Sequence, residues 1–180
     1  MARIPQIAGK ADVPAPYQYV VDQVLEVFGR VRGPFSILLH SPALAERLLP
    51  MVPFNRTGSI VEAPLRLIGI LATVREKDAA YVWAAQVRSA RENGVREGAI
   101  DVLRAKGDVN ALHPEERDVA VYARQLALTN KVDQSVFDTL QKRHGNQWLV
   151  ELTAIMSFYG ALCGVVNAFE VPAPDDGDRF

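Results

Sequence analysis

The chain has 180 residues, 49% of them hydrophobic, and a formal net charge of −1 at pH 7. Its length and apolar content suffice for a core of its own, and about one domain is expected. Basic and acidic residues nearly balance and form no stripe, which argues against nucleic-acid or membrane-surface binding. The single cysteine excludes an intrachain disulfide and a multi-cysteine metal site, and it suits a cytoplasmic protein. No apolar run follows the N-terminus, so we expect no signal peptide.

The first third of the chain is expected to hold short helical segments behind an extended arm. Prolines predict this arm over residues 1–16, because each lacks a backbone N–H and restricts the residue before it. Ser41 and Pro42 predict a helix start, with serine as the N-cap and proline at the first helical position. The other elements expected here are a helix over Tyr17–Phe28, a break over Gly29–Pro34, a short apolar turn over Phe35–His40, a helix from Ala43 to about Met51 and a loop over Pro53–Ser59.

The stretch Ala63–Gly94 is predicted to form two helices joined by the charged turn Arg75-Glu76-Lys77. Apolar residues in the first helix recur at three- and four-residue spacing and form one stripe. Asp78 is expected to be the N-cap of the second helix, where its carboxylate would accept free backbone N–H groups. Gly94 stands where a left-handed C-cap belongs.

Further helices are expected between Gly94 and a C-terminal tail. They cover Arg96–Lys106, a helix that begins at His113-Pro114, a helix between Asp133 and Gly145, and a last helix from about Asn146 to Phe169. The uncharged part of the last helix is about 15 residues long, short of the roughly 20 that span a bilayer, which indicates buried core. Residues 171–180 are rich in proline and aspartate, which predicts a polar, mobile tail.

The fold class follows from these patterns. No segment alternates apolar and polar residues over the length of a strand, and glycine and proline fall between the helical runs. The sequence therefore predicts an all-α, single-domain bundle of about eight helices. The helical domain is expected over residues 17–170, between the arm at 1–16 and the tail at 171–180.

The segment from Leu48 to Leu103 resembles the carboxymuconolactone decarboxylase family, which includes the alkylhydroperoxidase D proteins. The matching pattern is an apolar helix, a short turn, a Tyr-x-Trp-Ala segment that starts at Tyr81, and then Ala90 and Gly94 four residues apart. The resemblance extends more loosely to the end of the last helix. It implies an alkylhydroperoxidase D-like helical fold.

The motif of the redox branch of that family is absent from this chain. That branch carries Cys-x-x-Cys-x-x-x-His, and the register of the resemblance places these residues on Ala79, Val82 and Gln86. The family glutamate twelve residues before the first cysteine falls on Leu67. The decarboxylase branch usually keeps the histidine, which is glutamine here. Dithiol reduction of peroxides is therefore not expected.

A substrate pocket is expected on the second helix of the central pair. Gln86 shares a face with Ala79 and Val82, so its amide must find a partner or water. The resemblance places the pocket floor on these three residues, with Tyr81 or Trp83 as a wall. Either aromatic residue is equally consistent with simple core packing.

Acid–base chemistry would fall to other side chains, because glutamine transfers no proton near neutral pH. His40, which apolar neighbours are expected to bury in part, and Tyr81 are the candidates. Arg66 is the one charge in an otherwise apolar helix, and it is interpreted either as a solvated edge or as a group that binds a substrate carboxylate. The three histidines show no metal-ligand spacing, so we expect neither a metal nor another cofactor.

Two functions remain open, and whether the chain is an enzyme stays uncertain. The resemblance implies a carboxy-lyase similar to 4-carboxymuconolactone decarboxylase, acting on a small carboxylated lactone or aromatic-catabolic acid. The alternative is a binding or structural homologue that kept the fold without the chemistry. A peroxiredoxin-type alkylhydroperoxidase is less favoured.

The resemblance also implies a homo-oligomer, a trimer or hexamer. Small residues recur every four positions at Gly160, Gly164 and Ala168. This spacing suits close helix contact in the core or between subunits.

Overall fold

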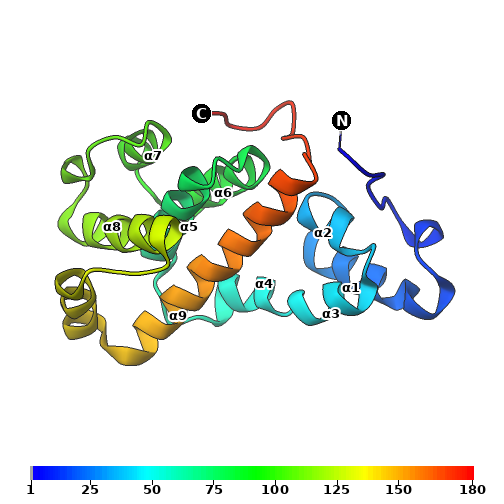
Figure 1. The fold of residues 1–180 in the computed structure, drawn as a ribbon, viewed down its shortest axis with the longest axis horizontal. Coiled ribbons are helices and arrows are strands. Elements are labelled where there is room, and N and C mark those ends of the chain that lie inside the picture. Colours follow the sequence, from blue (N-terminus) through cyan, green and yellow to red (C-terminus); the bar gives the residue numbers. More distant parts are fainter. Residues whose placement is uncertain (1) are drawn as a thin grey trace. The chain divides into compact units, whose positions relative to one another are not determined.

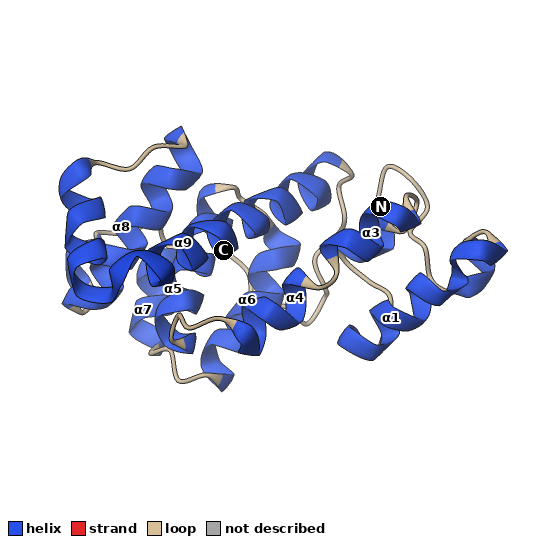
Figure 2. Ribbon diagram, turned by 90° about the horizontal axis from the view of Figure 1, so that it is seen from below, coloured by secondary structure: helices blue, strands red, loops and turns tan. Residues whose placement is uncertain are grey.

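The computed structural model describes residues 2–180, and this part of the chain forms helices and loops without a strand (Figures 1 and 2). The all-α bundle of about eight helices is confirmed. Two compact units are present and are described separately. The first unit ends at Ser59 and also includes Gly164–Pro172, and the second unit consists of Ile60–Cys163 and Ala173–Phe180. The expected arm, single domain and tail stay a prediction.

The first unit contains mostly short elements. In chain order they are the 3-10 turns η1 (Lys10–Asp12) and η2 (Ala15–Tyr17), the helices α1 (Gln18–Phe28), α2 (Pro34–Leu38), α3 (Pro42–Leu48) and α4 (Met51–Pro53), and the π-helical turn η3 (Phe54–Gly58). Two expectations were wrong here. Most of the turn expected over residues 35–40 is the helix α2. Burial of the four side chains from Phe35 to Leu38 stabilises this helix although it is short. Residues 53–59 contain the π-helical turn instead of a loop.

The second unit is organised around α5 (Ala63–Glu76), in which every residue from Arg66 to Val74 is buried. The helices that pack against α5 are α6 (Ala80–Glu92), α7 (Glu97–Arg104) and α8 (Pro114–Thr129), and the 3-10 turn η4 (Val109–Ala111) precedes α8 (Figure 1). Gly69 is a point of close approach. A Cβ atom added there would lie 2.8 Å from Met156 Sδ and 3.2 Å from Val119 Cγ1. The absence of a side chain at Gly69 is therefore what lets these neighbours pack against α5.

The long helix α9 (Gln134–Ala168) is interrupted at Gly145, whose backbone angles are φ 85° and ψ 174°. The predicted boundary between two helices at this glycine is thus confirmed as a break. By length and composition α9 could cross a membrane, but half of its most apolar stretch is buried within the protein. Trp148 donates its indole N–H to Glu62 Oε2 at 2.8 Å, and Tyr122 and Thr153 share a 2.7 Å hydrogen bond. These contacts agree with a core helix.

The turn between α5 and α6 differs from the expectation in one respect. Asp78 is not the N-cap of α6, because Ala79 occupies that position and no side chain caps the helix. Asp78 has a φ of +48° and pairs instead with Arg75, and Lys106 Nζ lies 3.2 Å from the same carboxylate. The ion pairs therefore engage the carboxylate that the sequence suggested as a cap. Gly94 has a φ of +79°, as its expected position after the helix requires.

Candidate functional site

The N-terminal half of α6 carries the positions that the resemblance singled out. Ala79 and Val82 are buried, and Gln86 is half-buried one turn further on. Because Ala79 has no side-chain oxygen, the first N–H groups of α6 have no side-chain cap. These groups form the positive end of the helix dipole, which favours negative charge nearby. The structure thus places an electropositive helix end beside a small, apolar face.

The amide of Gln86 forms no hydrogen bond within the part of the chain that the structure describes. Its partial exposure allows contact with water or with a ligand. Gln86 does not point into open solvent as an exposed residue would, so the expected pocket at this residue stays a prediction. Two cavities of the second unit, described below, are not lined by Gln86.

Arg66 lies in the first turn of α5 and is only 6% exposed. Its Nη1 donates to the carbonyl oxygen of Val61 at 2.6 Å. Burial lowers the pKa of Arg66 from its ordinary value, and Tyr159 acts in the opposite direction. An arginine stays protonated even so, and the solvated-edge interpretation is therefore wrong: Arg66 is a buried positive charge.

The two aromatic residues of α6 are both core residues. Tyr81 is 9% exposed, whereas Trp83 is fully buried. The indole N–H of Trp83 donates to Asp178 Oδ1 at 3.0 Å, so its polar atom is already engaged. Of the two, Tyr81 is the one with part of its side chain accessible to a small molecule.

His40 lies in the first unit, just after α2. It is exposed, whereas the sequence suggested partial burial, and its Nε2 donates to the carbonyl oxygen of Pro5 at 2.8 Å. The apolar residues next to it in the sequence point into the core and leave the histidine outside. Its acid–base role stays a prediction, and the candidate site of the second unit consists of the remaining residues.

A charged cluster that involves the C-terminal tail has no signal in the sequence. Asp178 receives hydrogen bonds from Trp83 on α6, from Arg91 near the end of α6, and from Arg104 at the end of α7. Burial alone would raise the pKa of Asp178, but the hydrogen bonds from Trp83 and Arg91 and the charge of Arg104 hold it below its ordinary value. Only the tertiary fold brings these four residues together, because they are separated by up to 95 positions.

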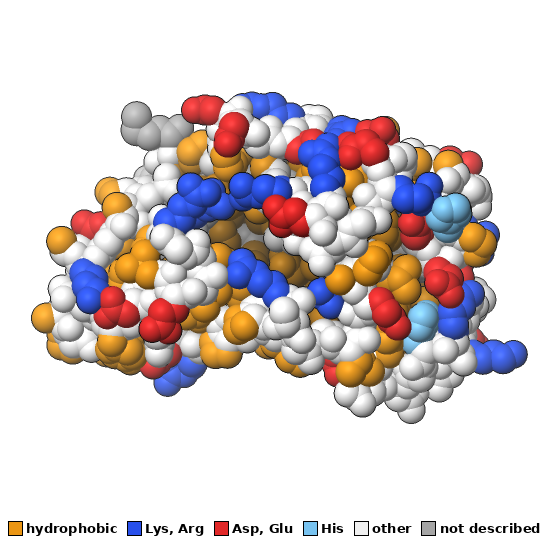
Figure 3. Space-filling model, turned by 180° about the vertical axis from the view of Figure 1, so that it is seen from behind, with side chains coloured by type: hydrophobic (Ala, Val, Ile, Leu, Met, Phe, Trp, Pro, Cys, Tyr) orange, Lys and Arg blue, Asp and Glu red, His pale blue; other side chains and the backbone are white. Residues whose placement is uncertain are grey.

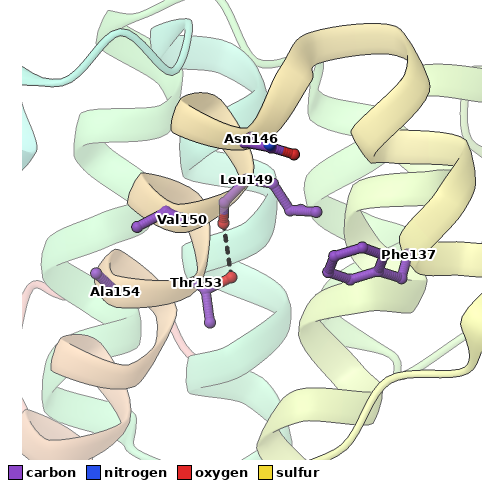
Figure 4. Close-up of a pocket in the computed structure, with 6 residues that line it drawn as sticks. All are labelled: Phe137, Asn146, Leu149, Val150, Thr153 and Ala154. Carbon is purple, nitrogen blue, oxygen red and sulfur yellow. Dashed lines mark hydrogen bonds between the residues drawn. The ribbon is translucent and has the colours of Figure 1, made fainter.

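Two cavities of the second unit lie away from α6. One, of about 240 Å³, lies between α5, α8 and α9 and includes Thr73, whose buried hydroxyl has no hydrogen-bond partner among the described residues. The other is an open apolar groove of about 590 Å³ over α9 (Figure 4). Phe137 and Val150 in this groove are 39% and 67% exposed. Neither cavity is lined by a candidate catalytic or substrate-binding residue.

Basic and acidic side chains both occur over the face shown in Figure 3. Their mixture agrees with the formal net charge of −1. Within the described residues, no group of three or more His, Cys, Asp or Glu side chains is placed to hold a metal ion. The absence of nucleic-acid and metal binding nevertheless stays a prediction.

We expect the only cysteine to be unreactive in the native protein. Cys163 is fully buried, and burial raises the pKa of its thiol to about 12. Because the thiolate is the nucleophile, almost none is available at mildly alkaline pH. A chromogenic disulfide reagent should therefore modify no thiol in native protein and one thiol per chain in denaturant. Rapid modification of the native protein would contradict this expectation.

No protein-family model and no curated protein sequence matches the chain. Solved structures do match. One is an alkylhydroperoxidase AhpD core structure, an uncharacterized peroxidase-related protein from Ralstonia eutropha JMP134, with a TM-score of 0.76, 18% identity, and coverage of 97% of this chain and 93% of that chain. The debrominase Bmp8, as a variant in complex with 2,3,4-tribromopyrrole, matches with a TM-score of 0.75 at 14% identity over 97% of this chain and 95% of that chain.

The apo form of the same debrominase matches with a TM-score of 0.73 at 14% identity, over 94% of this chain and 92% of that chain. All three similarities extend over nearly the whole of both chains, and they agree with the helical architecture described above. At these identities a structural likeness establishes the fold and leaves the activity open. The chain therefore has the alkylhydroperoxidase D-like fold.

Proposed function

We propose that this protein binds a small carboxylated molecule at the face of α6 formed by Ala79, Val82 and Gln86, and that it acts on it as a decarboxylase-like lyase without thiol chemistry. The observation that carries the proposal is the buried guanidinium of Arg66 on the neighbouring helix. A buried arginine is well suited to hold a carboxylate, because its planar N–H groups match the two carboxylate oxygens. The uncapped N-terminus of α6 adds a second positive element.

The small side chains at the motif positions support the same proposal. Ala79 and Val82 stand where the redox branch of the family has cysteines, so the space there is apolar and contains no nucleophile. The debrominase structure was determined with 2,3,4-tribromopyrrole, which indicates that this fold can hold a small ring. A ring that carries a carboxylate would suit an apolar face beside positive charge.

The proposed reaction requires three contributions from the chain. Arg66 would orient the carboxylate, and the carbon–carbon bond to it would break with release of carbon dioxide. The electron pair left behind would move onto an adjacent carbonyl oxygen, which the Gln86 amide and the α6 N–H groups would stabilise as donors. Tyr81 would then supply the proton to carbon.

The alternative is a homologue that binds a ligand or serves a structural role without catalysis. It is favoured by the replacement of the family histidine with Gln86, which removes the usual proton carrier at that position. A peroxidase is disfavoured, because Cys163 is buried and has no second thiol.

Replacement of Gln86 by leucine tests the site. With 4-carboxymuconolactone and a panel of small carboxylates, we expect wild type to show ligand-dependent thermal stabilisation and release of carbon dioxide. Gln86→Leu should weaken binding about fivefold, or about 1 kcal/mol, because a hydrogen bond to the ligand is lost. Its thermal stability without ligand should be unchanged or higher, since leucine joins an apolar face.

Gln23→Leu is the matched control, because Gln23 is also half-buried on a helix but lies on α1. It should leave ligand binding unchanged. Equal affinity in both variants would exclude Gln86 from the site, and binding without carbon dioxide release would favour the non-catalytic alternative. The localisation in the cytoplasm is not addressed by this experiment and stays a prediction.

We also propose that the chain assembles into a homo-oligomer, a trimer or hexamer. A Cβ atom added at Gly160 or Gly164 would meet nothing within 4 Å in the described residues. These glycines therefore do not allow close packing within the chain. Of the two interpretations of their spacing, a contact between subunits remains.

A further inference from the structure

The tail residues Ala173–Phe180 belong to the second unit and lie against α6 and α7 (Figure 1). One side chain of the tail, Asp178, makes most of the polar contacts. Its Oδ1 accepts from Trp83 Nε1 at 3.0 Å and from Arg104 Nη2 at 3.1 Å, and its Oδ2 accepts from Arg91 Nη2 at 3.0 Å. Hydrogen bonds between charged groups are the stronger kind, and this carboxylate receives them from two helices.

Two further tail residues contact the same surface. The ring of Phe180 packs edge-on against Trp83, with centroids 5.7 Å apart, and the guanidinium of Arg75 lies 4.0 Å from the centroid of the Phe180 ring. At Gly177 an added Cβ atom would lie 2.7 Å from Ala84 Cβ, so the backbone passes α6 too closely for a side chain. The contacts therefore select the pattern Gly-Asp-x-Phe.

The arginines of this surface do not depend on the tail for a partner. Each one also pairs with an acidic residue outside the tail, and these pairs are Arg75–Asp78, Arg91–Glu97 and Arg104–Asp101. The arginines would keep these partners, and so their positions, if the tail left. Arg91 and Arg104 would lose their hydrogen bonds to Asp178 but keep these other partners, whereas the indole N–H of Trp83 would be left without a hydrogen-bond partner among the described residues. Such a surface is prepared in advance for an acidic segment.

This surface is separate from the proposed substrate site. Ala84, which contacts the tail, and Gln86 are two positions apart and thus point about 160° away from each other around α6. Occupation of one surface therefore does not require occupation of the other.

We propose that the surface formed by Trp83, Arg75, Arg91 and Arg104 is a recognition site for acidic peptide segments of the pattern Gly-Asp-x-Phe. The tail of the chain is its resident occupant. A partner protein that presents the same pattern binds there in the molecules whose tail has left the surface.

The resident tail would compete with any peptide that is added to test the site. A tethered segment acts at an effective concentration of about a millimolar, so a free peptide with a dissociation constant of tens of micromolar competes poorly with it. The test therefore uses the full-length chain with Asp178→Ala and Phe180→Ala, which removes the tail contacts and keeps the receptor surface. Circular dichroism and a cooperative thermal transition establish that this variant is folded.

A fluorescent peptide with the sequence Ala173–Phe180 is titrated with the variant, and its anisotropy is measured. We expect a dissociation constant on the order of 10–100 μM, and binding to wild type at least about tenfold weaker. The same peptide with Asp178→Asn should not bind. The peptide with Asp176→Asn loses the same charge at an exposed residue, and it should bind like the unmodified peptide.

Two results would overturn the proposal. One is no binding of the unmodified peptide to the folded variant. The other is equal binding of the Asp178→Asn and Asp176→Asn peptides, which would indicate attraction by net charge alone. As a check on the receptor side, adding Arg91→Ala to the variant should abolish binding, whereas adding Arg88→Ala, an exposed residue of the same helix, should leave it unchanged.

Discussion

Replacement of Trp83 by alanine is expected to lower the free energy of unfolding by about 3–5 kcal/mol. Trp83 is among the largest fully buried side chains of the chain, and its removal would leave a cavity beside α6. Two partners would also lose contacts, because the indole donates to Asp178 and packs against Phe180. Urea denaturation followed by circular dichroism measures this change.

Trp83→Phe separates packing from hydrogen bonding at the same position. The phenyl ring keeps most of the apolar contact but cannot donate to Asp178, so we expect a smaller loss of about 1–2 kcal/mol. Destabilisation of less than about 1 kcal/mol in Trp83→Ala would show that the site collapses around the missing ring, contrary to this expectation.

Replacement of Gly69 by valine should cost about 1–3 kcal/mol of unfolding free energy. Even the first added carbon would lie 2.8 Å from Met156 Sδ, and valine adds two more carbons. Met156 is itself 1% exposed and has little room to move aside. The same denaturation experiment measures the effect.

Gly98→Ala is the control for Gly69→Val. Gly98 also lies in a helix, α7, but an added Cβ atom there would have open space among the described residues. Alanine reduces the conformational freedom of the unfolded chain, so this substitution should stabilise the protein by up to about 1 kcal/mol. If Gly69→Val were neutral as well, the close approach at α5 would not constrain the core.

The helical fold could be predicted because its signals are local. The spacing of apolar residues determines which face of α9 is buried, and proline or glycine marks where the helices begin and end. The break at Gly145 was predictable for the same reason, since glycine adopts a positive φ at little cost. Short elements such as α2 were not, because burial by distant residues stabilises them.

The polar contacts could be predicted less well, because they depend on which residues meet in three dimensions. Asp78 has the residue type of an N-cap, yet Arg75 and Lys106 compete for its carboxylate. The composition of the tail indicates solvation, and nothing near Asp178 in the sequence points to Trp83. The candidate site on α6 rests on the family register, so its residues could be proposed from the sequence, while their roles stay predictions.

The break in α9 is expected to limit where the chain can change in length. Before Gly145 the helix is mostly exposed, with Leu140 as its buried side chain. After Gly145 an apolar stripe faces the core at helical spacing, and it consists of Trp148, Leu149, Leu152, Ile155 and Met156. One residue inserted after the break would turn everything beyond it by about 100° and carry this stripe away from the core. The same insertion before Gly145 would end at a residue whose backbone angles are already not helical, so we expect insertions and deletions to be tolerated better on that side of the glycine.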